Sequence, residues 1–68
     1  MENLIEGLQR EMNRVREMIT VYESIPKGAG IMGAMFMRES IKIAEVAIAN
    51  GDTVDMMRAY TNLQEYKD

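Results

Sequence analysis

The first third of the chain repeats apolar residues at alternating steps of four and three, the heptad spacing of a helix. This spacing predicts a helix over residues 2–24, whose apolar seam consists of Met1, Ile5, Leu8, Met12, Val15, Ile19 and Tyr22. Leu4 and Met18 flank the seam and make it broader than that of a two-stranded coiled coil, so we expect this helix to pack against two neighbours. Glu6 and Arg10 lie on the opposite, solvated face.

A second helix is predicted over residues 30–50, after a short connection. Pro26 disfavours the helical conformation at Ile25, and the glycines that follow adopt positive φ angles at low cost. Apolar residues cover more than half of the circumference of this helix, which is typical of a central helix with neighbours on two sides. They are Met32, Phe36, Ile43 and Ala47 on one side and Met37, Ile41, Ala44 and Ile48 on the other.

A third helix is predicted over residues 53–66. Gly51 suits the left-handed position at the end of the second helix, and Asp52 or Thr53 is expected to cap the third. The apolar stripe of the third helix is Met56, Ala59, Tyr60 and Leu63. No segment alternates with period two for long enough to predict a strand. We therefore expect residues 1–68 to form one all-α domain, in which the first two helices make a long hairpin and the third is shorter.

The small size of the chain points to self-association. In a protein of 68 residues, a lone core rarely contributes more than about 3–5 kcal/mol, so disulfides, a metal or a partner chain usually add stability. The sequence has no Cys, which excludes disulfides, and no His, which makes a zinc site atypical. We expect no metal and no cofactor. Close packing and oligomerisation remain, and a homo-oligomer, most simply a dimer, is the predicted assembly.

Eight methionines are the most unusual feature of the composition. Met suits irregular cores, but it is also frequent on surfaces that bind partner helices. We expect four to fill the core, namely Met12, Met18, Met56 and Met57. The second helix has more apolar residues than two neighbours can cover, and an exposed apolar patch marks an interface. The predicted interface residues are Met32, Met35, Phe36, Met37, Ile43 and Val46.

The charge balance disfavours nucleic acid as a partner. Eight Lys and Arg stand against eleven Asp and Glu, a net charge of −3, whereas binding to phosphates requires cations. The candidates for contact with an anion or nucleic acid are Arg10, Arg14, Arg16 and Lys27. Acidic residues surround the three arginines, so the simpler interpretation is a salt-bridged, solvated face.

Two alternatives to a self-associating interaction protein stay open. In the first, a dimeric regulator contacts nucleic acid through the doubled face of Arg10, Arg14 and Arg16. In the second, a monomeric adaptor docks on another protein through the methionine-rich second helix. An enzyme is disfavoured, because His and Cys are missing and no pair of carboxylates lies on an otherwise apolar face.

The segment from Gly28 to Gly33 has the GxGxxG spacing of a dinucleotide-binding turn, and Asp52 follows about twenty residues later. That turn requires a strand before it and a parallel sheet around it. A helix is predicted before it here, so we interpret the glycines as a loop followed by a close helix contact. A weaker version of the hypothesis keeps an anion at the start of the second helix, with Lys27 nearby.

The sequence also favours the cytoplasm. No basic segment followed by an apolar run opens the chain, and the longest uncharged stretch, residues 28–37, is about half the length that spans a bilayer. We therefore expect no membrane association. The absence of Cys fits a reducing compartment.

From about residue 20 onwards, the chain resembles short helical proteins encoded by tailed phages and prophages. The resemblance covers about residues 20–64 and rests on Tyr22-Glu23-Ser24-Ile25-Pro26-Lys27-Gly28, Ile41, Ala44, Ala47, Gly51-Asp52, Met57, Ala59-Tyr60 and Leu63. It implies a setting in the host cytoplasm and an accessory or regulatory role. It transfers no functional residue, because that group has no defined activity.

Overall fold

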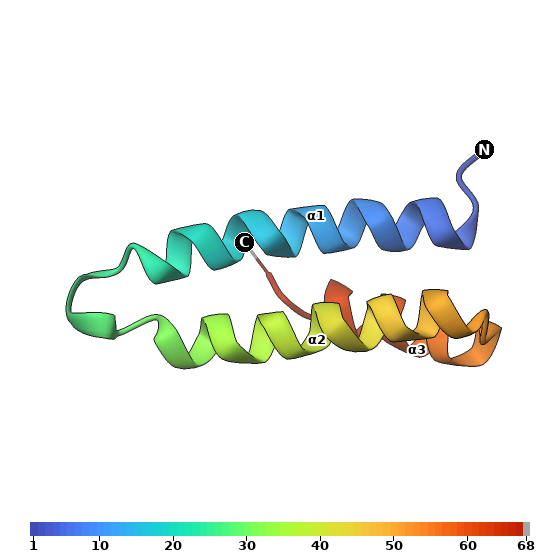
Figure 1. Ribbon diagram of the computed structural model, residues 1–68. Coiled ribbons are helices and arrows are strands. Elements are labelled where there is room, and N and C mark those ends of the chain that lie inside the picture. Colours follow the sequence, from blue (N-terminus) through green and yellow to red (C-terminus); the bar gives the residue numbers. More distant parts are fainter. Residues whose placement is uncertain (68) are drawn as a thin grey trace.

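The protein folds into three α-helices, as seen in a computed structural model that describes residues 1–67 (Figure 1). Helices α1 (Leu4–Glu23) and α2 (Ile31–Asn50) form an antiparallel hairpin, and the shorter α3 (Thr53–Gln64) packs against both. A single 3₁₀ turn, η1 (Pro26–Gly28), lies in the hairpin connection. The predicted all-α architecture is confirmed, and each helix end lies within two residues of its predicted position.

Local side-chain and backbone chemistry fixes the helix ends. The side chain of Asn3 accepts a hydrogen bond from the amide of Glu6 at 2.8 Å, and the Glu6 carboxylate accepts one from the amide of Asn3 at 3.4 Å. This capping box satisfies two amides at the start of α1. Gly51 ends α2 with φ +66°, and Asp52 caps α3 by accepting a hydrogen bond from the amide of Asp55 at 3.1 Å. The predicted left-handed Gly51 is thus confirmed, and of the two predicted caps the structure selects Asp52.

The three glycines of the GxGxxG pattern have steric roles in the hairpin connection. Gly28 has a positive φ of +70°. A Cβ atom on Gly30 would overlap the carbonyl oxygen of Tyr22, and a Cβ atom on Gly33 would lie 2.8 Å from the Tyr22 ring. The pattern therefore joins two helices at close range, as predicted. Lys27 also has a positive φ, +63°, although positive φ angles in this connection were predicted for the glycines.

The core lies between the three helices and consists of small and medium side chains. It contains Leu8, Met12, Val15, Met18, Ile19, Ala34, Met37, Ile41, Ala44, Ala47, Met56, Ala59 and Leu63. Three of the four methionines predicted to fill the core do so, but Met57 is wrongly predicted, since it is exposed on the outer face of α3. Three of the four alanines of α2, Ala34, Ala44 and Ala47, lie on its buried side, where small residues let helices approach closely.

The apolar seam predicted for the first helix is confirmed in its middle and wrong at its start. Leu8, Met12, Val15 and Ile19 are buried in the core and Tyr22 packs against it, whereas Met1 and Ile5 are exposed. The flanking residues Leu4 and Met18 widen the buried face, as predicted, and Glu11 is buried there too. Within this face, Leu4, Leu8, Glu11, Val15, Met18 and Tyr22 make a second row with the same steps of four and three. The sequence pattern did not indicate the burial of Glu11, because it is charged.

Candidate interaction surface

One face of α2 exposes five large apolar side chains, which we call the α2 stripe. Met32, Met35, Phe36, Ile43 and Val46 are each between 50% and 68% exposed. They come from five of the six positions predicted as interface. The sixth, Met37, is buried in the core at 2% exposure, because each helical residue is rotated by about 100° from the one before it. Met37 therefore adds nothing to the exposed surface.

Charged residues interrupt the α2 stripe at its middle. Glu39 and Lys42 are exposed and, within residues 1–67, neither forms an ion pair. Both line a groove of about 400 Å³ between α2 and α3, together with Ile43 and Val46 of the stripe. On the α3 side, the groove is lined by Asp55, Arg58, Ala59 and Asn62. The groove thus joins the apolar stripe to a polar wall of mixed charge.

A second, smaller apolar patch lies on α3. Val54 and Met57 are both 57% exposed and line a shallow depression with other residues of α3 and with Glu65. Arg58 and Asn62 line both this depression and the groove of the α2 stripe, so the two surfaces are neighbours. Val54 and Met57 themselves do not line the groove and lie outside the α2 stripe.

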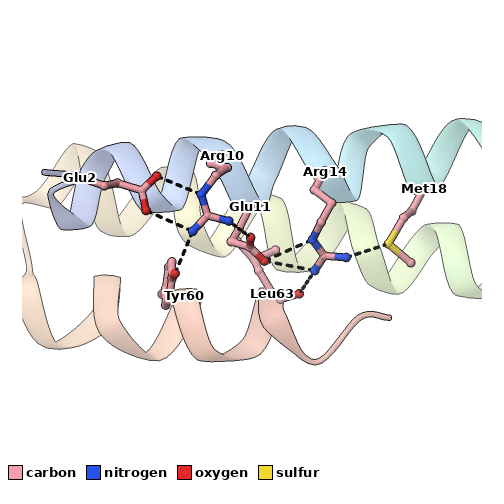
Figure 2. A network of polar contacts seen from close by, with 7 residues as sticks. All are labelled: Glu2, Arg10, Glu11, Arg14, Met18, Tyr60 and Leu63. Atoms are coloured by element: carbon pink, nitrogen blue, oxygen red, sulfur yellow. Dashed lines mark hydrogen bonds and ion pairs between the residues drawn. The ribbon is translucent and has the colours of Figure 1, made fainter. Parts of the chain in front are cut away.

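The arginines of α1 participate in a polar network between α1 and α3 (Figure 2). Arg10 pairs with Glu2 at 2.9 Å and with Glu11 at 2.5 Å. Arg14 pairs with Glu11 at 3.1 Å and donates a hydrogen bond to the carbonyl oxygen of Leu63 at 2.9 Å. Glu11 is only 4% exposed. Two guanidinium groups thus neutralise a buried carboxylate, which would be costly to bury alone.

The network shifts the pKa values of Glu2 and Arg10, which form its exposed end. A hydrogen bond from Arg10 lowers the pKa of Glu2 below its ordinary value of 4.5. The pKa of Arg10 is raised, mainly by its hydrogen bond to Glu2 and also by its hydrogen bond to Tyr60. Arg10 therefore stays fully charged, and Glu2 stays ionised to a lower pH than a free glutamate.

The four cations considered for nucleic acid do not form one patch. Arg10 and Arg14 face α3, whereas Arg16 reaches α2 and pairs with Glu45 at 3.5 Å. Lys27 lies in η1, at the hairpin connection. Each of the three arginines thus has a carboxylate beside it, as expected for a salt-bridged face.

Within residues 1–67, no group of three or more acidic, histidine or cysteine side chains is arranged to hold a metal ion. In the same part of the chain, no helix is both long and apolar enough to cross a membrane.

The buried hydroxyl of Ser40 is hydrogen-bonded to the hydroxyl of Tyr66 at 2.8 Å. This contact joins α2 to the segment after α3.

Glu39 and Lys42 were not among the residues predicted for the exposed surface of α2. The sequence does contain a signal for Glu39, because Met32, Phe36, Glu39, Ile43 and Val46 follow the same steps of four and three as the seam of α1.

Comparison with known proteins gave no match, neither to a family model, nor to a curated protein, nor to a solved structure.

Proposed function

We propose that this protein is a small helical protein–protein interaction module that associates with itself through the α2 stripe. The proposed role is non-catalytic. The observation that carries the proposal is the exposure of five large apolar side chains along one face of one helix. Contiguous exposed apolar patches mark sites of association, because their burial removes apolar area from water.

The shape of the fold supports this proposal. The core is thin, with many alanines and a smallest dimension of 16 Å for the whole molecule. A core of this size contributes little stability by itself. Burial of the α2 stripe against a second copy would add large side chains such as Phe36 to the apolar area removed from water.

The first test is the mass of the protein by light scattering at tens of micromolar. The proposal expects a dimer or a higher oligomer, and a monomer with a cooperative thermal melt would contradict it. Phe36→Asp should shift the mass to that of the monomer, because a carboxylate would be placed in the middle of the contact. Retention of the oligomer by this variant would show that the α2 stripe is not the contact.

Met57→Asp is the matched control. Met57 is an exposed apolar residue at an interior helical position, like Phe36, but it lies on α3, outside the α2 stripe and its groove. The variant introduces the same charge at a similar cost in helix propensity, so it should keep the oligomeric mass. If Met57→Asp dissociates the oligomer and Phe36→Asp does not, self-association occurs through α3.

The two alternatives have separate readouts in the same experiments. A monomeric adaptor would have the mass of one chain and bind a hydrophobic dye through the α2 stripe. A nucleic-acid regulator would bind duplex DNA at low salt and lose this binding as salt increases. The pairing of Arg10, Arg14 and Arg16 with carboxylates argues against that regulator.

Two further proposals concern the setting of the protein. We propose that it acts in the cytoplasm, which is the host cytoplasm if the chain is phage-encoded, in an accessory or regulatory role. The absence of Cys supports a reducing compartment, and the resemblance to helical phage and prophage proteins supports the accessory role. Fractionation of native cells and capture of bound proteins would test both.

A further inference from the structure

We propose that two copies pair through antiparallel α2 helices, with Glu39 of each copy bound to the partner's Lys42 across a two-fold axis. This inference rests on the proposed self-association and adds its geometry. It follows from the spacing of the α2 stripe and from the two charged residues at its middle.

The stripe has the pattern of a helix-pairing seam. Met32, Phe36, Glu39, Ile43, Val46 and Asn50 follow one another at steps of four, three, four, three and four residues. Such steps align side chains along one face, where a second helix can pack against them. Each of the apolar members is at least half exposed, so this seam is unpaired in the single chain.

The first seam of the protein shows how a glutamate is accommodated at such a position. Glu11 occupies a seam position of α1 and is buried, and its charge is balanced by Arg10 and Arg14. Glu39 occupies the equivalent position of the α2 seam, but within residues 1–67 it has no cation partner. A helix that covers this seam must therefore bring a cation to Glu39.

A second copy brings that cation only when the helices run in opposite directions. In a parallel pair in register, Glu39 would face the partner's Glu39, and like charges at a seam position repel. In an antiparallel pair with its two-fold axis between residues 39 and 42, Glu39 lies beside the partner's Lys42. Symmetry repeats the contact, so both glutamates and both lysines are paired.

The same two-fold axis also matches the apolar ends of the stripe. It places Phe36 within about one residue, or about 1.5 Å along the axis, of the partner's Val46, so that the half of each seam with Phe36 meets the half with β-branched side chains. Antiparallel helices also oppose their macrodipoles, whereas parallel helices align them. Charge, side-chain size and dipole thus favour one orientation.

Spin labels test the orientation without relying on stability. The sequence has no Cys, so Met32→Cys and Ile43→Cys each give a single labelled site and leave Glu39 and Lys42 in place. In the antiparallel pair, the two Met32 labels are separated by about 17 residues along the helix axis, or about 25 Å at about 1.5 Å per residue. The two Ile43 labels are separated by about five residues, or about 8 Å along the axis, and couple at short range.

Each outcome of the labelling experiment has one meaning. A long Met32 distance with a short Ile43 distance is the expected result. Short distances at both sites show a parallel pair, which overturns the inference and leaves self-association intact. Long distances at both sites place the contact elsewhere and also overturn it. No coupling, together with a monomeric mass, means that the proposed function itself fails.

Charge reversal tests the ion pair separately. In the antiparallel pair, Glu39→Lys alone sets four lysines around the two-fold axis, and Lys42→Glu alone sets four glutamates there. Each single variant is expected to weaken dimerisation about tenfold or more, and the double variant, Glu39→Lys with Lys42→Glu, is expected to restore it. Failure of the double variant to recover affinity, with its helical content unchanged, would overturn the ion pair.

Discussion

Arg10 and Tyr60, which are 50 residues apart in the chain, are hydrogen-bonded across the boundary between α1 and α3. A guanidinium nitrogen of Arg10 donates to the hydroxyl of Tyr60 at 3.0 Å, and the same side chain holds Glu2 and Glu11 (Figure 2). The contact between these helices therefore combines a polar network at the surface with the apolar core between the helices. Glu11 is the least exposed charged residue of this network, so the loss of its charge should have the largest effect on stability.

Glu11→Gln should lower the free energy of unfolding by about 1–3 kcal/mol. The substitution keeps the shape of the side chain but removes the charge that Arg10 and Arg14 share. Urea denaturation at pH 7 and at one fixed protein concentration measures this loss, since self-association would otherwise change the apparent stability.

Glu17→Gln is the matched control for Glu11→Gln. Glu17 is also a glutamate of α1, but it is exposed and, in the described part of the chain, forms no ion pair. Its substitution should change stability by less than about 0.5 kcal/mol. Equal effects of the two substitutions would contradict the structural role of Glu11.

The network also makes stability depend on pH at its exposed end. The folded state holds the pKa of Glu2 below 4.5 through the hydrogen bond from Arg10, so folding favours the ionised carboxylate. A group whose pKa is lowered on folding contributes stability above its unfolded pKa and loses it as pH falls through the folded value. The stabilisation from Glu2 should therefore be complete above about pH 5.5 and disappear in acid.

Unfolding of the wild type and of Glu2→Gln across this pH range measures the effect. The wild type should be the more stable at neutral pH, and the two curves should converge once the pH falls below the lowered pKa of Glu2 in the folded state. High salt should reduce the difference, since Glu2 is exposed and its ion pair is screened. If the difference in stability between the two proteins were the same at every pH, the pKa of Glu2 would not change on folding.

The positions of the three helices could be predicted from periodicity, capping residues and glycines, because these are local signals. The burial of Glu11 in α1 could not, since a glutamate is expected at the surface until its arginine partners are known. On α2, apolar residues cover both sides, so periodicity alone did not separate the buried Met37 from the exposed Phe36. The alanines and Ser40 beside Met37 were the usable signal, because small residues mark the closely packed side.

The start of α1 makes a testable contrast between two residues of the seam predicted from sequence. Leu8 is fully buried, whereas Ile5 is 46% exposed. Leu8→Ala should cost about 2–5 kcal/mol of stability through lost burial and a cavity, and Ile5→Ala should cost less than about 1 kcal/mol. Thermal or urea denaturation measures the stability of both variants. Similar losses would contradict the exposure of Ile5.

Gly30 should be the least replaceable glycine of the hairpin connection. A Cβ atom there would overlap the carbonyl oxygen of Tyr22, which belongs to the backbone of α1 and cannot move aside by a rotamer change. Gly30→Ala is therefore expected to displace the start of α2 and to cost about 1–3 kcal/mol.

Gly51→Ala separates this steric effect from the conformational freedom of glycine. A Cβ atom on Gly51 meets nothing within 4 Å, but its φ of +66° penalises any side chain by about 1–2 kcal/mol. Both variants should thus lose stability, but only Gly30→Ala should change the packing of the Tyr22 ring on Gly33. The aromatic NMR shifts of Tyr22 report that packing, and unchanged shifts in Gly30→Ala would contradict the close contact between the two helices.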